Sequence, residues 1–349
     1  MAGRENAAMS DAPLLRVHDL RVAFKLDEGT VRAVDGVSFD VYPGQVVGIV
    51  GESGCGKSVT MKAILQLVEP PGRITNGEIL YRQGGNAIDL TRLPPRGPAM
   101  RALRGAEIAL IPQEPMAAFS PVHTVGEQIV EAIRLHEKTN GQTVSRREAR
   151  ARTIELFRDV GISMPDQRVD AYSWQLSGGL RQRAMIAMAL SCKPRLLIAD
   201  EPTTAIDVTT QAQILALLRD LQRKYDTAII FITHDLGVIA QMANHVVVMY
   251  LGRVMEEGTV DEIFHSPKHP YTQALLRSMP NMHGETRTAL PIISGTLPHP
   301  FNRPSGCPFH PRCPDAMPDR CASRVPSPHE VEANRIVSCF LYHDESEPV

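Results

Sequence analysis

The sequence lacks any apolar run long enough to cross a membrane. Its longest runs, such as Ala228 to Ile232 and Val246 to Tyr250, are far shorter than the roughly 20 residues that a membrane-spanning helix needs. It also lacks an excess of one charge: the formal net charge of -2 argues against a nucleic-acid partner, which would require clustered Lys and Arg. Met1 to Pro13 contains no apolar signal segment, so export is not expected. Any association with a membrane is therefore expected to run through a partner.

What remains is the composition of a globular protein. Of 349 residues, 43% are hydrophobic and 22% charged, which leaves room for one large domain and an appendage. Short continuous runs rich in Val and Ile predict strands that are buried on both faces of a sheet. These runs are Val46 to Val50, Ile108 to Ile111, Leu196 to Ala199, Ala228 to Ile232 and Val246 to Met249.

Helical patterns separate these strands. Apolar residues form one face of a helix at positions 214 to 221, and a second pattern runs from Ile154 to Val160 and ends at Gly161. Alternating strands and helices predict an α/β domain with a largely parallel sheet. A polar, helical insert is predicted at about 115–178. Prolines crowd the chain after Ser266 and predict a separate, loop-rich appendage, so we expect domains at 13–265 and 266–349.

A glycine-rich loop follows the first predicted strand and leads into a helical segment. It matches the pattern G-x-x-x-x-G-K-[ST], whose backbone N–H groups curl around a phosphate. We expect Lys57 to pair with the β- and γ-phosphates of ATP and the Ser58 hydroxyl to bind Mg²⁺. The alternative is a turn that only connects strand to helix. The loop consists of Gly51, Glu52, Ser53, Gly54, Cys55, Gly56, Lys57 and Ser58.

Two carboxylates end the predicted strand that begins at Leu196. Asp200 is expected to hold Mg²⁺, and Glu201 is the candidate general base that polarises the attacking water. His234 ends the next strand and is a candidate to contact the γ-phosphate and orient that water. An acid pair at a strand end also arises by chance, and a lone histidine there is more often structural.

The segment Leu176-Ser177-Gly178-Gly179-Leu180-Arg181-Gln182-Arg183 decides between families. With it, the chain resembles the ATP-binding subunits of ABC transporters, whose signature is LSGG followed by a basic helix. The resemblance covers nearly the whole chain. It implies a P-loop NTPase (RecA-like) core with an antiparallel β subdomain and a helical insert, plus a proline- and cysteine-rich C-terminal extension. It also implies that Ser177, Gly178 and Gly179 bind the ATP of a partner subunit, so that two subunits sandwich two ATP molecules.

The same resemblance assigns further residues by position. Gln113 matches the glutamine that reaches Mg²⁺ and the attacking water, and Asp207 matches the acid of a loop that crosses the dimer interface. Thr60 joins the expected nucleotide contacts. Phe24 best matches the aromatic residue that stacks on adenine. An insertion around positions 25 to 28 blurs that register, and a plain core role for Phe24 stays open.

The tail carries two further signals. His269-Pro270-Tyr271 lies in a segment that resembles the start of the C-terminal extension of peptide and nickel importers. Downstream, the spacing Cys307-x5-Cys313-x7-Cys321-x17-Cys339 supplies four soft ligands. Disulfides are disfavoured in a reducing cytoplasm, and the paired C-x2-4-C spacing of zinc sites is missing. The resemblance favours a [4Fe–4S] cluster on all four thiolates, with zinc or unligated thiols as alternatives.

The resemblance implies an ATPase that powers an importer of di- and oligopeptides from the cytoplasmic face of the inner membrane. Its expected partners are two membrane-spanning permease subunits, a second, paralogous ATPase and an extracytoplasmic solute-binding protein. Nickel, glutathione and opines travel on similar machines and remain alternative cargoes. A soluble ABC ATPase would lack the His269-Pro270-Tyr271 tail, and a catalytically dead binding module would be expected to replace Glu201 or His234.

Overall fold

The computed structural model describes residues 12–114, 118–139, 142–204, 206–279, 293–299 and 301–343. Pro115, where the helical insert was predicted to begin, and Ala205, two positions before Asp207, lie outside these ranges. Within the described ranges, no helix combines the length and the apolar character that crossing a membrane would require.

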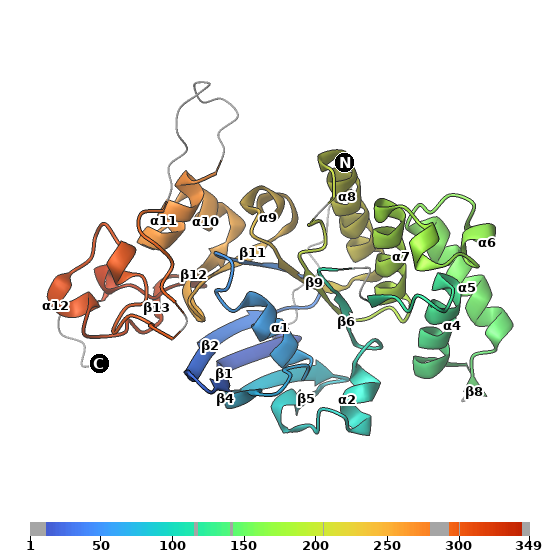
Figure 1. The fold of residues 1–349 in the computed structure, drawn as a ribbon, viewed down its shortest axis with the longest axis horizontal. Coiled ribbons are helices and arrows are strands. Elements are labelled where there is room, and N and C mark those ends of the chain that lie inside the picture. The colour runs from blue at the N-terminus through green and yellow to red at the C-terminus, as the bar shows by residue number, and fades with distance from the viewer. Residues whose placement is uncertain are drawn as a thin grey trace.

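The strands form two main sheets (Figure 1). A four-stranded antiparallel sheet has the order β2-β1-β4-β5, and an eight-stranded mixed sheet has the order β13-β14-β12-β11-β3-β10-β9-β6. β7 and β8 make a small hairpin. The bounds are β1 Leu15–Leu26, β2 Gly29–Val41, β3 Val46–Val50, β4 Gly72–Gln83, β5 Asn86–Asp89, β6 Ile108–Ile111, β7 Lys138–Thr139, β8 Gln142–Thr143, β9 Leu196–Asp200, β10 Ala228–Ile232, β11 His245–Tyr250, β12 Arg253–Thr259, β13 His329–Glu332 and β14 Arg335–Val337.

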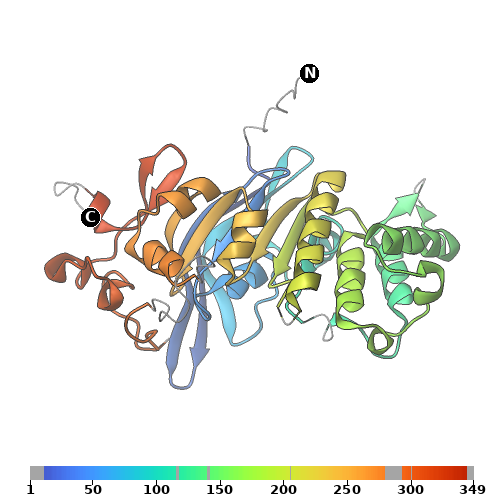
Figure 2. The ribbon, with the colours of Figure 1, turned by 90° about the horizontal axis from the view of Figure 1, so that it is seen from above.

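Helices cover the sheets and form a separate group at one end of the molecule, where α4 to α7 pack together (Figures 1 and 2). The opposite end is formed by the C-terminal segment. The bounds are α1 Lys57–Ile64, α2 Pro98–Leu103, α4 Val125–His136, α5 Arg146–Asp159, α6 Pro165–Arg168, α7 Gly178–Leu190, α8 Val208–Tyr225, α9 Leu236–Met242, α10 Val260–His265, α11 Pro270–Arg277 and α12 Pro318–Cys321.

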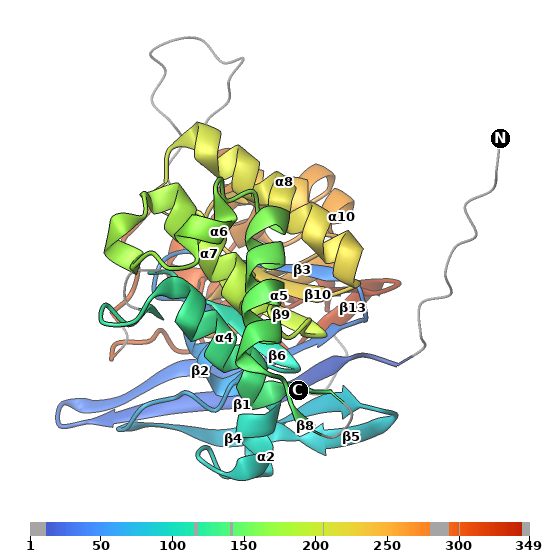
Figure 3. The same cartoon turned by 90° about the vertical axis from the view of Figure 1, so that its right-hand side faces the viewer.

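The five predicted strands are confirmed as β3, β6, β9, β10 and β11, and they lie parallel and adjacent in the large sheet. Their side chains alternate between two hydrophobic cores. Val47 and Ile49 of β3 face the core shared with α1 and the antiparallel sheet, whereas Val46 and Val50 face the core shared with the other helices. Both faces of the sheet are thus covered, as the continuous apolar runs predict. Figure 3 shows the antiparallel sheet as a layer below the mixed one.

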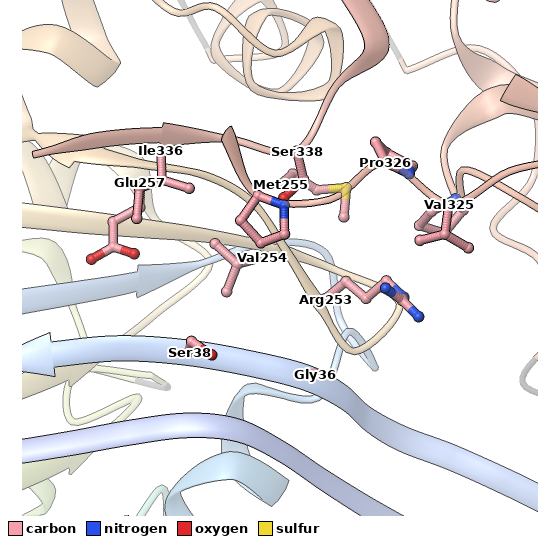
Figure 4. A pocket seen from close by; sticks show the side chains of 12 residues that line it. Gly36, Ser38, Arg253, Val254, Met255, Glu257, Val325, Pro326, Ile336 and Ser338 are labelled. Carbon is pink, nitrogen blue, oxygen red and sulfur yellow. The ribbon is translucent and has the colours of Figure 1, made fainter. Parts of the chain in front are cut away.

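The C-terminal segment adds two strands to one edge of the eight-stranded sheet. β14 pairs antiparallel with β12, and β13 pairs with β14. His329–Glu332 is mostly polar and Arg335–Val337 has only three residues, so neither strand carried an apolar signal of pairing. A narrow cavity lies between β2, β12 and this segment, and Figure 4 shows side chains such as Met255, Val325 and Ile336 lining it.

A buried carboxylate joins the segment to β12. Glu256 is fully buried, and its Oε1 accepts hydrogen bonds from the Lys268 N–H at 2.9 Å and the Arg335 guanidinium at 3.0 Å. Its Oε2 accepts a hydrogen bond from the His269 N–H at 2.9 Å. Because both side chains are shielded from water, Glu256 is the buried charge partner of Arg335, which also pairs with the more exposed Glu332 at 3.1 Å.

We expect Glu256→Ala to lower the free energy of unfolding by about 3–5 kcal/mol, because the substitution removes the buried partner of Arg335 and leaves it only Glu332, whose side chain is 49% exposed. Chemical denaturation of the full chain measures this loss. The matched control is Arg150→Ala, which removes the exposed ion pair with Asp170 and should cost less than about 1 kcal/mol. Equal losses in the two variants would contradict the assignment.

Candidate functional site

The glycine-rich loop lies between β3 and α1 and is packed against neighbouring backbone. Gly51 has a φ of 149°, and a Cβ placed on it would lie 2.1 Å from the carbonyl oxygen of Met249. Gly56 has a φ of 102°, and its Cβ would lie 2.4 Å from the Ala33 carbonyl oxygen. Only glycine fits both positions, so the sequence pattern has a direct steric cause.

Lys57 begins α1 and lies inside the curve of the loop. Its side chain is almost buried, and Nζ donates hydrogen bonds to the carbonyl oxygens of Gly51 at 2.7 Å and Glu52 at 3.1 Å. Cys55 is buried beside it, and burial raises the pKa of its thiol. The ammonium group is therefore held by the loop itself, where it can pair with a phosphate oxygen.

Ser58 and Asp200 form an oxygen-rich corner between the loop and the end of β9. Ser58 Oγ donates a hydrogen bond to Asp200 Oδ1 at 3.1 Å. Burial raises the pKa of Asp200, although the Ser58 hydrogen bond opposes that shift. Ser58, Asp200 and Gln113 together line a cavity of about 350 Å³. Hydroxyl, carboxylate and amide oxygens are the ligands that Mg²⁺ prefers, so the donor set at this corner fits that ion.

Glu201 is the centre of a hydrogen-bond network that joins three strand ends. Its Oε2 accepts hydrogen bonds from Gln113 Nε2 at 3.1 Å and from Thr204 Oγ1 at 2.9 Å, while its Oε1 lies 3.3 Å from His234 Nδ1. Gln113, Glu201 and His234 follow β6, β9 and β10, which are neighbours in the sheet. The three predicted catalytic residues therefore lie together.

The backbone and charge of Glu201 are both unusual. Its φ of 47° is left-handed, a conformation that non-glycine residues adopt only at a cost and that clusters at functional sites. Burial acts to raise the pKa of Glu201, but hydrogen bonds from Thr204 and His234 outweigh it and hold the pKa below its usual range. The side chain is thus an ionised acceptor at neutral pH.

The signature segment lies apart from the phosphate loop, at the start of α7 (Figure 1). Ser177 is the N-cap residue, but its side chain makes no capping hydrogen bond, and both Ser177 and Gly178 are exposed. A Cβ on Gly178 would meet no atom within 4 Å. The N-terminus of a helix of this length attracts anions, so an approaching phosphate would find these groups accessible.

Two residues predicted to contact the nucleotide, Thr60 and Phe24, make contacts within the protein. Thr60 is fully buried, and its hydroxyl donates a hydrogen bond to the Gly56 carbonyl oxygen at 3.0 Å inside α1. Phe24 is half-buried on β1 and faces Gly72 on β4, where a Cβ would lie 2.4 Å from the ring. The Phe24 ring also packs against the core beneath the antiparallel sheet, as its alternative core role would require.

Sequence reasoning missed three residues that contact this site. Thr204 lies three positions after Glu201 and donates to its carboxylate. The other two, Tyr271 and Arg312, come from the C-terminal segment and both contact Glu52 in the phosphate loop. Thr204 lies close enough in sequence to be found by local reasoning, whereas a contact between positions 52 and 312 leaves no local pattern.

The four tail cysteines are unpaired in this structure. Cys307, Cys321 and Cys339 are buried and Cys313 is half-buried. Burial, together with the neighbouring thiols, raises the pKa of Cys313 to about 11 and that of Cys339 to about 12. Within the described ranges, no group of three or more His, Cys, Asp or Glu side chains is arranged to hold a metal ion. Thiols are the donor type that iron–sulfur clusters use, and they ligate metal only after losing their protons.

Comparisons with known proteins agree with this geometry. Residues 34–204 match the family model described as ABC transporter, and residues 255–321 match that described as oligopeptide/dipeptide transporter, C-terminal region. One similar solved structure is a dimeric ATP-binding cassette in a post-hydrolysis state, bound to ADP and phosphate. The two chains superpose with a TM-score of 0.61 at 25% sequence identity, and the match covers 70% of this chain and 98% of the other. CbiO1 from Clostridium perfringens has a TM-score of 0.59 at 26% identity, over 73% of this chain and 92% of its own.

Fold and site together define an ABC-type ATPase. Curated relatives narrow the class further. The dipeptide transport ATP-binding protein DppD of Escherichia coli is 46% identical over 95% of this chain and 98% of its own length. The oligopeptide transport ATP-binding protein OppD of Bacillus subtilis is 47% identical over 96% of this chain and 91% of its own. The chain belongs to this family, the ATP-binding proteins of ABC transporters for dipeptides and oligopeptides.

We expect Asp200→Asn to stabilise the metal-free chain at neutral pH. The folded-state pKa of Asp200 is raised, so its ionisation costs stability as the pH rises through that pKa, whereas an amide does not ionise. The gain in free energy of unfolding should be present at about pH 7 and shrink toward about pH 4, where the wild-type carboxyl is also neutral.

Chemical denaturation in the presence of EDTA at both pH values measures this difference. Asp166→Asn is the control, because the Asp166 side chain is 67% exposed and should show no such gain. A gain at Asp200 that is equal at both pH values would contradict burial as its cause.

Proposed function

We propose that this chain hydrolyses MgATP at a site between the phosphate loop and the strand ends, and couples hydrolysis to peptide import. The observation that carries the proposal is the Glu201 network, which brings Gln113, Thr204 and His234 onto one carboxylate beside the Ser58–Asp200 corner. An ionised carboxylate next to an Mg²⁺ site is the arrangement needed to polarise water toward a γ-phosphate. We place the ATPase domain at 13–265 and the C-terminal extension at 266–349.

Each residue has a distinct proposed role. Residues 51–58 hold the phosphates with backbone N–H groups, and Lys57 pairs with the β- and γ-phosphates. Ser58, Asp200 and Gln113 hold Mg²⁺, which when bound neutralises phosphate charge. Glu201 polarises the attacking water, and His234 orients it. Phe24 is the proposed contact for adenine, whereas Thr60, which is fully buried, would support the loop through its hydrogen bond to Gly56.

We propose that the exposed signature completes the site of a second ATPase subunit. These residues, Ser177, Gly178 and Gly179, begin α7, and α7 lies away from α1, which follows the chain's own phosphate loop (Figure 1), so a neighbouring subunit could use them. A dimeric cassette among the similar structures supports this pairing. The second subunit is proposed to be a paralogue.

We further propose that two membrane-spanning permease subunits and an extracytoplasmic solute-binding protein complete the transporter. The chain would then lie at the cytoplasmic face of the inner membrane, held there by the permeases. Names of the relatives support dipeptides and oligopeptides as the cargo class.

A [4Fe–4S] cluster on Cys307, Cys313, Cys321 and Cys339 is proposed as a structural or sensing group of the extension. The support is the proximity of four unpaired thiols in a segment with few regular elements. Small loop-rich segments commonly gain order from a metal or a cross-link.

We expect Glu201→Gln to retain ATP binding and to lower kcat by about 100- to 10,000-fold, because the amide keeps the shape of the side chain but cannot polarise water. Phosphate release from the assembled transporter measures kcat, and nucleotide retention on the complex measures binding. Glu155→Gln, an exposed change on α5, is the control. Wild-type phosphate release in the Glu201 variant would remove Glu201 from this role.

After anaerobic purification, the chain is expected to contain iron and acid-labile sulfide in equal amounts. Cys339→Ser should reduce both, since it removes one ligand, whereas Cys192→Ser, outside the tail, should reduce neither. Elemental and sulfide analyses check this outcome. Zinc in place of iron, or neither metal, would refute the cluster.

A further inference from the structure

Glu52, the second residue of the phosphate loop, is held by side chains more than two hundred positions away. Its backbone N–H donates to the Tyr271 hydroxyl at 2.9 Å. Its carboxylate accepts two hydrogen bonds from Arg312, Nη1 to Oε2 at 2.6 Å and Nη2 to Oε1 at 3.1 Å. Its carbonyl oxygen accepts from Lys57 Nζ at 3.1 Å. Every polar group of Glu52 is therefore engaged, two of them by the C-terminal segment.

The Arg312 side chain is also held by groups other than Glu52. Its side chain is 4% exposed, and Nε donates to the Ser294 carbonyl oxygen at 3.0 Å. Nη1 also donates to the Tyr250 hydroxyl at 3.2 Å, and the guanidinium lies 5.8 Å from the centre of the Tyr250 ring. A two-pronged pair between a buried, immobilised guanidinium and a carboxylate is stronger and more directional than an exposed ion pair.

An aromatic cluster holds Tyr271, whose hydroxyl accepts the hydrogen bond from the Glu52 N–H. The rings of Tyr250, Tyr271 and Phe309 lie 4.7 to 5.4 Å apart, centre to centre, with Tyr271 fully buried. His269 Nδ1 accepts a hydrogen bond from the Tyr271 N–H at 2.9 Å at the start of α11. The His269-Pro270-Tyr271 motif thus presents the tyrosine hydroxyl to the phosphate loop.

We propose that Arg312 is a positioning residue for ATP, acting through Glu52. The loop at 51–58 contains a single carboxylate, that of Glu52, whose side chain is 25% exposed. A nucleotide carries several negative charges, so an unpaired carboxylate in its cradle would repel it. Arg312 cancels that charge and turns the carboxylate toward the C-terminal segment. This inference rests on the proposed role of the loop as the phosphate site.

The test compares KM for ATP and kcat in the assembled transporter. Arg312→Met should raise KM about tenfold with kcat within about twofold of wild type, because the lost interaction acts on nucleotide affinity. Adding Glu52→Gln to that variant should return KM to within about twofold of wild type, since a neutral amide repels no phosphate. Arg324→Ala, an exposed change in the same segment, is the matched control and should leave both constants unchanged.

An unchanged KM in Arg312→Met would overturn the inference. A raised KM that Glu52→Gln does not relieve would also overturn it, because it would mean that Arg312 only holds the segment together. If Arg312→Met does not fold, Arg312→Lys is the test. Lysine keeps the positive charge but cannot make both guanidinium hydrogen bonds to Glu52, so KM should rise about threefold. Adding Glu52→Gln should again lower KM. An unchanged KM in that folded variant would overturn the inference as well.

Lys57→Ala separates this inference from the proposed function. If Lys57→Ala keeps wild-type turnover, the loop does not bind the phosphates and both proposals fail. If it abolishes turnover while Arg312→Met behaves as wild type, only the inference about Arg312 fails.

Discussion

The carboxyl edge of the parallel strands is the constraint on which the site depends. β3, β10, β9 and β6 are consecutive neighbours in one sheet, so the loops that leave them must meet at one edge. The phosphate loop, His234, the acid pair and Gln113 leave those strands in that same order. At Glu201 the backbone also leaves the strand conformation, because its φ of 47° is left-handed. A hydrogen bond of 2.9 Å from the Glu201 N–H to the Ile232 carbonyl oxygen of the adjacent strand supports that conformation.

The two acids at this edge are tuned in opposite directions by their surroundings. Asp200 is the more buried, and burial raises its pKa, so it gains by binding a cation that replaces lost solvation. Burial would also raise the pKa of Glu201, but the hydrogen bonds from Thr204 and His234 outweigh burial and lower that pKa. A carboxylate with a lowered pKa is a weak proton acceptor and a good hydrogen-bond acceptor. This difference supports the proposed division of roles, in which Asp200 binds the metal and Glu201 polarises water.

The core strands and the phosphate loop were predictable because their causes are local. A strand buried on both faces must be continuously apolar, and a loop with positive φ at Gly51 and Gly56 must contain glycine. Pairing of β14 with β12 was not predictable, since Arg335–Val337 is short and carries no alternation that would choose a partner. The Arg312–Glu52 pair joins positions 260 apart, and any of the chain's many acids would have been an equal candidate from sequence. In the tail, the spacing of cysteines suggested a ligand set, whereas no group of three or more His, Cys, Asp or Glu side chains in the described part of the chain is arranged to hold a metal ion.

Continuity of the sheet explains how a C-terminal segment can act on a loop near the start of the chain. β14 is hydrogen-bonded to β12, and Glu256 of β12 binds the backbone N–H groups of Lys268 and His269 that lead into α11. The side chain of His269 accepts a hydrogen bond from the Tyr271 N–H, and the Tyr271 hydroxyl accepts one from the Glu52 N–H. Each link is a short, directional hydrogen bond, and Glu256, His269 and Tyr271 are themselves buried, so a shift of α11 against the sheet would break hydrogen bonds that are at least partly shielded from water. The segment is therefore in direct contact with the loop proposed to bind the phosphates, although it lies more than two hundred positions away along the sequence.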